Sequence, residues 1–418
     1  MPFAPESRPP SHFRKPARTG KFPLGSRLSS CPLALRRGIV PLLALSAASL
    51  LAACGGGGGE NVIQKKVGED VRPVAIPVLA TKNTTRVPGK DAIEDAAGVS
   101  RAVWPALGDA LRPQAVAIAS EDDWRGGIAA SVLLSAPVRA PILLSDGADL
   151  PGATADTLKS LRPRGSVYTS GAQVIAIGAA PKPEGFRTIR VGGKDPYALA
   201  EQIDSLLARA RGKVSNSVVV ASGEEPEFAM PAAGWAAKSG DPVLFTARDV
   251  VPPATRRAIA RHRHPDIYVL GPASVVSDQV VRDLRKLGSV TRVGGRDPVA
   301  NAIAFARFSN GRFGWGAQDP GHGIVIVNVD RPADAAASGA LSSSGTYGPL
   351  LLTDSAKALP PALNSYLLDI QPGYRDDPVR GVYNHAWLIG DESAISAVAQ
   401  AKIDELTEIV RVSQRPSP

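Results

Sequence analysis

The chain has 418 residues, 44% of them hydrophobic and 21% charged, so it is long enough for two or three domains with apolar cores. Its net charge of +9 comes mainly from residues 1–53, which hold eight of the 48 basic and one of the 39 acidic residues. The remainder has 40 bases against 38 acids, a net charge of +2, and gives little support to nucleic-acid binding.

The N-terminal segment predicts export and lipid attachment. Arg36 and Arg37 precede an apolar run over 38–53, which is shorter than the about 20 residues that a spanning helix needs. The run ends in Leu-Ala-Ala-Cys at 51–54, which resembles the bacterial lipoprotein processing site. There a diacylglycerol is attached to the Cys, and cleavage makes that Cys the first mature residue. We expect residues 1–54 to be a lipoprotein signal peptide ending at the lipidated Cys54; the alternative is a plain secretory signal with an incidental Cys.

Residues 55–85 are expected to form a flexible linker and lead-in, because Gly55 to Gly59 are five consecutive glycines. Cys31 lies in the segment that we expect to be removed, so the mature chain would hold one Cys, which is acylated. Disulfides, zinc–thiolate sites and thiol catalysis are therefore not expected, and no cofactor is predicted.

The rest of the chain repeats one pattern three times. A marker of Arg-Val, two residues ending in Gly, a base and Asp begins at residues 86, 190 and 292. A Pro-led apolar strand recurs at 141–144, 242–245 and 349–352. A period of about 100 residues is too long for solenoid repeats and fits domain-sized modules. The predicted boundaries are 86–189 for module 1, 190–291 for module 2, 292–412 for module 3 and 413–418 for a tail.

Within each module, the pattern predicts alternating helices and strands. A helix follows the marker, as at 196–210 and 298–308, and leads to a short apolar strand at 115–119, 218–221 or 324–327. A helix rich in small residues, the Pro-led strand, a further helix and a strand ending in Gly come next. The strands are continuously apolar, which is typical of parallel strands covered on both faces. The fold class is therefore α/β, with three tandem, open, doubly wound parallel-sheet modules. Residues 409–412, an incomplete fourth marker, are expected to supply the last strand of module 3.

The marker residues are candidates for both structural and ligand-binding roles. Its glycines allow a sharp turn from strand to helix, and bare N–H groups at a helix N-terminus also favour anions. Its Asp is expected to cap the helix. The basic residues could contact an anion: Arg86, Lys90, Arg190, Lys194, Arg292 and Arg296.

With these motifs in hand, the chain resembles the cell-wall-binding repeat 2 family over roughly residues 86 to 412. Members of this family look like surface proteins held noncovalently on anionic cell-wall glycopolymers by three modules packed as a pseudo-trimer. The resemblance implies that three apolar triplets belong to the attachment motif. They are Ile142, Leu143 and Leu144; Val243, Leu244 and Phe245; and Leu350, Leu351 and Leu352. From the residues alone, these triplets are expected to be core strands, with any ligand role at their carboxyl ends. The Arg that usually follows the marker Asp is replaced by Ala92, Pro196 and Pro298.

Three further features have two readings each. His262 and His264 lie among Arg256, Arg257, Arg261 and Arg263, which suggests a solvated basic edge and a candidate polyanion contact rather than a metal site. The acids at 121–123 and 224–225 follow strands and are expected to be solvated rather than catalytic. Module 3 carries insertions at 310–322 and 371–385 whose aromatic residues and arginines suit either sugar stacking or packing against the core.

The leading hypothesis is a lipid-anchored, non-enzymatic protein on the outer face of the cell membrane and in the cell wall. It would bind an anionic cell-wall polysaccharide and be monomeric, with intramolecular pseudo-threefold packing. The alternative is a solute-binding lipoprotein of a transporter, which needs two lobes and one cleft. A wall-acting enzyme comes third, because the sequence shows no nucleophile elbow, phosphate-binding loop or zinc helix.

Overall fold

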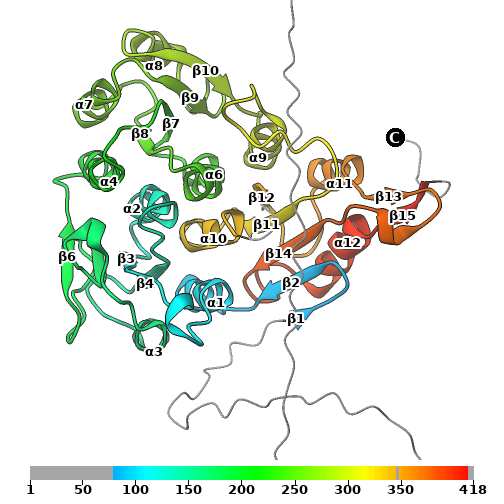
Figure 1. Cartoon of the computed structure of the whole chain (residues 1–418). Coiled ribbons are helices and arrows are strands. Elements are labelled where there is room, and N and C mark those ends of the chain that lie inside the picture. The colour runs from blue at the N-terminus through cyan, green and yellow to red at the C-terminus, as the bar shows by residue number, and fades with distance from the viewer. Residues whose placement is uncertain (1–78, 345–347, 413–418) are drawn as a thin grey trace, which may run out of the picture. The chain divides into compact units, whose positions relative to one another are not determined.

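Three of the four β-sheets in the described residues have the same strand order (Figure 1). The computed structural model describes residues 79–344 and 348–412, all of them in one compact unit that spans Val67–Pro418. The predictions for residues 1–54, including the lipidation of Cys54, lie outside the described residues. None of the described helices is long and apolar enough to cross a membrane.

Sheets 1 and 2 each have four parallel strands. Sheet 1 has the order β4 (Ile142–Ser145), β3 (Val116–Ser120), β5 (Val174–Ile177) and β6 (Thr188–Val191). Sheet 2 has the order β8 (Val243–Thr246), β7 (Ser217–Ser222), β9 (Asp266–Leu270) and β10 (Ser289–Val293). The first strand of each module therefore lies between the second and the third. This order reverses the direction of winding at the centre of the sheet, as in doubly wound folds.

Sheet 3 has the same order but takes its last strand from the other end of the chain. It runs β12 (Leu350–Thr353), β11 (Gly323–Asn328), β14 (His385–Ile389) and β2 (Thr84–Val87), with β1 (Leu79–Ala80) added antiparallel at the edge. The markers of modules 2 and 3 likewise end sheets 1 and 2, as β6 and β10. Each marker strand thus completes the sheet of another module, and the first marker completes the third sheet.

The prediction that residues 409–412 supply this last strand is wrong. The strand β15 (Val410–Arg411) instead pairs with β13 (Gly373–Tyr374), inside the second insertion of module 3. The position beside β14 belongs to β2, whose Arg86 and Val87 are buried and whose full marker continues into a capped helix. The incomplete copy lacks that continuation.

The helices follow the predicted alternation. In chain order the α-helices are α1 (Ala92–Val103), α2 (Trp124–Ala130), α3 (Gly152–Leu161), α4 (Pro196–Arg211), α5 (Pro226–Ala229), α6 (Pro231–Ser239), α7 (Pro253–Arg261), α8 (Asp278–Leu284), α9 (Pro298–Arg307), α10 (Asp334–Ser342), α11 (Pro361–Asp369) and α12 (Ala397–Thr407). Short 3₁₀ turns occupy η1 (Asp109–Leu111), η2 (Ser131–Leu134), η3 (Val167–Thr169) and η4 (Pro378–Arg380). Between β5 and β6 module 1 has a turn where modules 2 and 3 have α8 and α12. Pro181 and Pro183 lie in that segment, and they disfavour a helix.

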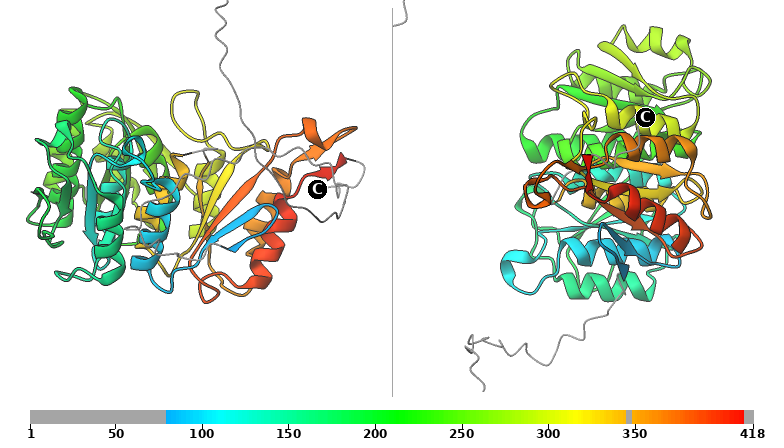
Figure 2. Two further views of the ribbon diagram at one scale, coloured as in Figure 1. Left: turned by 60° about the horizontal axis from the view of Figure 1, so that its bottom comes forward. Right: turned by 90° about the vertical axis from the view of Figure 1, so that its right-hand side faces the viewer.

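The small-residue helices of the three modules contact one another. Helices α2, α6 and α10 lie side by side at the centre of Figure 1, and Figure 2 shows the sheets around them from two other sides. The hydroxyl of Ser131 donates to the carbonyl oxygen of Ala336 at 3.2 Å. A Cβ on Gly339 would lie 3.0 Å from the carbonyl oxygen of Ala233. Small side chains allow this close approach, which explains the Ala, Gly and Ser content of the three segments.

Three sheets of one topology do not form two lobes around one cleft. The α/β prediction of repeated parallel-sheet modules is confirmed. The transporter-type solute-binding architecture, which needs two lobes, finds no counterpart in the described residues.

Candidate functional site

The marker loops lie at the carboxyl ends of the sheets, at three equivalent places. We call these switch points 1, 2 and 3; they lie between β3 and β5, β7 and β9, and β11 and β14. Open α/β sheets bind ligands in the crevice where the direction of winding reverses. At each switch point a glycine follows the third strand of the module: Gly178, Gly271 or Gly390.

The marker arginines hold these glycines in place. The Nη1 groups of Arg86 and Arg292 donate to the carbonyl oxygens of Gly390 and Gly271 at 2.8 Å, and Arg190 donates in the same way to Gly178. In return, each glycine N–H donates to the carbonyl of the marker Val beside that Arg, at 2.8–3.0 Å. The three glycines have φ between +61° and +113°, a region that favours glycine. In all three repeats, the marker is therefore linked to the end of the neighbouring strand by the same pair of hydrogen bonds.

The arginines that begin the three markers differ in how far they are buried. Arg86 is 1% exposed and also donates to Gln400 Oε1 and to the carbonyl of Asp391, and its burial lowers the pKa of the guanidinium. A surface polymer cannot reach its side chain in this structure. Arg292 is partly exposed and pairs with Asp278, and Arg190 is exposed.

The other marker bases are exposed. Lys90 pairs with Glu94 at 3.0 Å, which raises the pKa of the Lys90 ammonium, and Arg296 lies 3.2 Å from Asp297. Lys194 has no ion pair among the described residues. The predicted capping role of the marker Asp is confirmed, because Asp91, Asp195 and Asp297 each accept from the backbone N–H three residues later.

The three apolar triplets are core. None of their nine side chains is more than 1% exposed, which agrees with the expectation from the residues that they form buried strands. Direct contact between these side chains and a polymer is therefore not possible in this conformation. Their carboxyl ends lie at the same edge of the parallel sheets as the switch points.

A different side chain faces the glycine at each switch point. A Cβ built on Gly178 would lie 3.3 Å from Leu199 and 3.5 Å from Oδ2 of Asp123. One on Gly271 would lie 3.5 Å from Val275 and 3.9 Å from the ring of Phe228, and one on Gly390 would lie 2.5 Å from Ala394 and 2.7 Å from Nη1 of Arg331. Next to an aliphatic side chain at each switch point, the same place thus has a carboxylate, an aromatic ring or a guanidinium.

Switch point 1 keeps a cavity of about 240 Å³. Its lining residues come from the ends of β3, β5 and β6 and from the start of α4: Asp123, Gly178, Ala179, Gly192, Gly193, Asp195, Pro196 and Leu199. Asp123 Oδ1 accepts from Gly126 N–H, and Asp195 Oδ1 accepts from Ala198 N–H. The second oxygen of each carboxylate has no hydrogen-bond partner within the part of the chain that the structure describes. The cavity is therefore rich in acceptors.

At switch point 3, one guanidinium forms ion pairs with two buried carboxylates. Arg331 lies 2.6 Å from Asp95 Oδ2 and 2.8 Å from Asp334 Oδ2, and both acids are 1% exposed. Neither oxygen of Asp334 accepts a well-aligned hydrogen bond from the described residues. Burial raises the pKa of both carboxyls; the neighbouring Asp334 raises that of Asp95 further, and Arg331 opposes the rise.

This cluster predicts a pH-dependent stability. A carboxyl whose pKa is raised in the fold stabilises the fold below its unfolded pKa of about 4, and this contribution is lost as the pH rises through the folded pKa. As the pH rises from 4 to 8, we expect the free energy of unfolding of Asp334→Asn to increase by about 1–3 kcal/mol relative to that of the parent chain. Urea unfolding at several pH values measures this, with the exposed Asp330→Asn as the control. A difference that shrinks as the pH rises would contradict the assignment.

Three of the four arginines in the basic run at 256–263 form ion pairs within the molecule, and Arg263 is exposed. Arg257 and Arg261 contact Glu201 at 2.7 and 2.8 Å, although Glu201 is only 5% exposed. His262 is buried and lies 3.0 Å from Asp204; burial lowers its pKa, but the hydrogen bond and charge of Asp204 outweigh this and raise it overall. The predicted solvated basic edge is thus an ion network between α4 and α7, and most of its charge is not free for a polyanion. No group of three or more His, Cys, Asp or Glu side chains in the described ranges could hold a metal ion.

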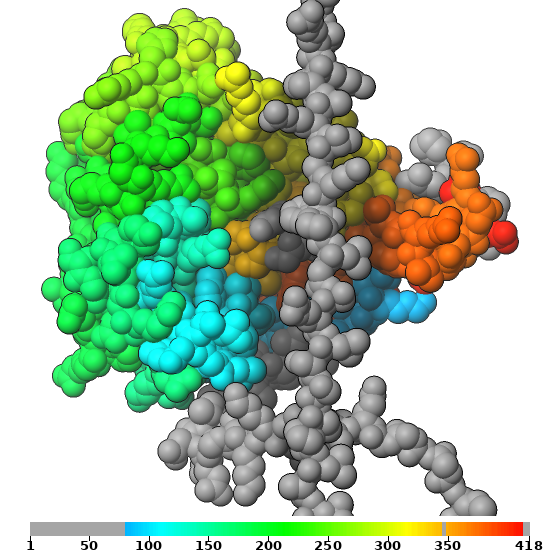
Figure 3. All heavy atoms as spheres, in the orientation of Figure 1, coloured from blue at the N-terminus to red at the C-terminus, as the bar shows by residue number. Residues whose placement is uncertain are grey.

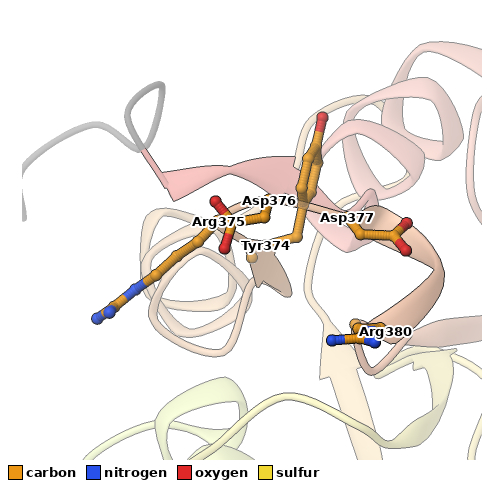
Figure 4. Close-up of a pocket in the computed structure, with 7 residues that line it drawn as sticks. Tyr374, Arg375, Asp376, Asp377 and Arg380 are labelled. Atoms are coloured by element: carbon orange, nitrogen blue, oxygen red, sulfur yellow. The ribbon is translucent and has the colours of Figure 1, made fainter.

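The two insertions of module 3 differ. Phe313 is 1% exposed and stacks on Tyr268 with 3.5 Å between ring centroids, and Trp315 packs edge-on against Trp235, so the first insertion packs against the core. The second insertion is exposed and appears in orange at the outer edge of Figure 3. It forms a 300 Å³ hollow around Tyr374, where Arg375 and Arg380 extend on opposite sides of the ring (Figure 4).

Sequence reasoning missed Asp123 and Leu199 as lining residues. The acids at 121–123 were expected to be solvated, and Leu199 was recognised only as part of the helix predicted at 196–210. The available signal was positional, because Asp123 follows the first strand of its module and so lies beside the winding reversal.

Comparisons with known proteins agree with this fold. Cwp6 and Cwp8 from Clostridium difficile both match with a TM-score of 0.59 and 19% identity over 78% of this chain, which is 48% and 52% of theirs. The amidase enhancer of Bacillus subtilis (strain 168) is 23% identical over 273 residues, 64% of this chain and 36% of that protein. The chain therefore spans about a third to a half of the length of these relatives. The model of the family described as Cell wall binding domain 2 (CWB2) matches residues 190–281 and 292–400. These two segments are CWB2 repeats, so the chain carries repeats of the family that its repeated pattern resembles.

Proposed function

We propose that this chain is a non-enzymatic surface protein that binds an anionic cell-wall glycopolymer noncovalently. The observation that carries the proposal is the pair of CWB2 repeats, at 190–281 and 292–400. Two points add support: the third sheet-containing module has the same strand order, and the structural neighbours are named as Cwp proteins. Several weak contacts on one chain would raise the overall affinity for a repeating polymer.

The exposed marker bases are proposed to contact the anionic groups of the polymer. Arg190, Lys194 and Arg296 are exposed, and Lys194 has no competing ion pair among the described residues. Lys90 and Arg292 hold surface ion pairs, which water and a polyanion can exchange at little cost. The buried Arg86 and the apolar triplets are proposed to act indirectly, by fixing the positions of the strand ends.

Sedimentation with purified bacterial cell walls tests the proposal. We expect the chain to sediment with intact walls and to stay in the supernatant with walls stripped of their phosphate-rich glycopolymers. Raising the salt concentration from about 50 to 500 mM should release part of the bound protein, because exposed ionic contacts are screened. Equal retention on intact and stripped walls would refute the glycopolymer as the ligand.

We also propose the lipid anchor, the pseudo-threefold packing of a monomer, and the predicted module boundaries. Contacts among α2, α6 and α10 support the packing, and the sequence at 51–54 supports the anchor. Metabolic labelling with a radioactive fatty acid tests the anchor: the label should enter the parent chain and be lost in Cys54→Ser. Label that persists in this variant would refute Cys54 as the attachment site.

A further inference from the structure

The three switch points differ in a way that bears on ligand binding. The same backbone frame is built three times, because each marker Arg and each strand-end glycine make the same reciprocal hydrogen bonds. Besides an aliphatic side chain at each place, the side chains near that frame are Asp123, Phe228 and Arg331. The backbone geometry is the same at the three switch points, but the side chains beside it differ.

Switch points 2 and 3 are occupied by the protein itself. A Cβ on Gly271 would lie 3.5 Å from Val275 and 3.9 Å from the ring of Phe228, and both of these residues are 7% exposed. Arg331 lies over Gly390, and its guanidinium is engaged by Asp95 and Asp334. An incoming ligand group at either place would have to displace an apolar ring or a buried ion cluster, and leaving a buried charge unpaired is costly.

Switch point 1 has room and unused acceptors. The cavity of 240 Å³ is lined by two carboxylates, which each have one oxygen without a hydrogen-bond partner among the described residues. Gly192 lies at its rim, and a Cβ there would meet nothing within 4 Å. No cationic side chain lines the cavity, while Arg190 and Lys194 lie beside it in the chain and are exposed. Carboxylates accept hydrogen bonds from hydroxyl, amide N–H and ammonium groups and repel phosphates.

We infer that switch point 1 is the one place of the three that takes a ligand unit, and that this unit is a hydrogen-bond-donating sugar. The inference rests on the proposed function and deepens it. The donor-rich sugar of the polymer, a hexose or hexosamine, sits in the cavity with its hydroxyl or amide protons on Asp123 and Asp195. The neighbouring phosphate or carboxylate of the polymer lies outside, within reach of Arg190 and Lys194. Three similar modules thus provide one sugar-binding crevice.

Two variants test the crevice, and one matched variant controls for the fold. Gly192→Phe fills the cavity from its rim, and Asp123→Asn removes the charge while an amide oxygen can still cap α2. Pro88→Phe places the same aromatic ring at the equivalent marker position, beside switch point 3, where Arg331 lies near Gly390. Affinity for soluble glycopolymer released from purified walls is measured by fluorescence titration, with thermal unfolding recorded for each variant.

We expect Gly192→Phe and Asp123→Asn to weaken binding at least about 10-fold, since hydrogen bonds to a charged partner contribute about 1.5–3 kcal/mol. Pro88→Phe should bind within about twofold of the parent chain. Parent-like binding by Gly192→Phe and Asp123→Asn, or equal loss in all three variants at unchanged melting temperature, would overturn the inference and leave wall binding intact. If the parent chain does not bind the polymer at all, the proposed function and this inference both fall.

Discussion

Replacing Arg86 by alanine is expected to lower the free energy of unfolding by about 3–5 kcal/mol, the usual effect of removing one partner from a buried charged network. The side chain is 1% exposed and its guanidinium bonds to Gln400 and to the carbonyls of Gly390 and Asp391. Alanine would leave these acceptors without donors and open a hole between β2 and α12.

Arg190→Ala is the matched control, because Arg190 has the same place in its repeat and the same bond to a strand-end glycine but is exposed. Its loss should cost about 1 kcal/mol or less. Urea unfolding of both variants gives the comparison. Equal destabilisation would mean that burial of the first marker arginine has no energetic consequence and would contradict the account of sheet 3.

Removing residues 79–87 is expected to have a still larger effect. It deletes β1 and β2, exposes the edge of β14, and strips the contacts of Thr84, Arg86 and Val87, all of which are 0–1% exposed. The loss should exceed about 5 kcal/mol, which is comparable with the total stability of an ordinary domain. Hydrogen exchange would show this as loss of protection in β14 and α12.

This loss of stability should come from the missing strand pairing with β14, so restoring the strand should restore the stability. A chain in which residues 79–87 are moved behind residue 412 through a flexible linker should regain protection in β14, because the strand can pair again. Unchanged protection in the truncated chain would contradict the assignment of β2 as the last strand of sheet 3.

Much of the architecture followed from the sequence because its signals are local. Continuously apolar strands, such as 115–119, where the structure has β3 (Val116–Ser120), predicted parallel sheets. The marker Asp predicted helix caps that the structure contains. The partner of a strand is not a local property. Residues 409–412 and 84–87 both read as a marker strand, and only the fold shows that the N-terminal copy lies beside β14.

The site was harder to predict for the same reason. Each marker Arg was recognised as an isolated positive charge, whereas its hydrogen bond to a glycine 12 to 304 residues away decides what it does. Asp123, Phe228 and Arg331 share no sequence motif, and they become comparable only through the glycines that they face. The run of four arginines at 256–263 indicated a polyanion surface, but Glu201 and Asp204, on another helix, form ion pairs with Arg257 and Arg261.

The most direct test of the whole account is a crystal structure of the chain soaked with an oligosaccharide fragment of its cell-wall glycopolymer. The account predicts density for one sugar unit at switch point 1, in contact with Asp123 and Asp195, and an anionic group near Lys194. Density over Phe228 or Arg331, at the hollow around Tyr374, or equally at all three switch points would contradict it.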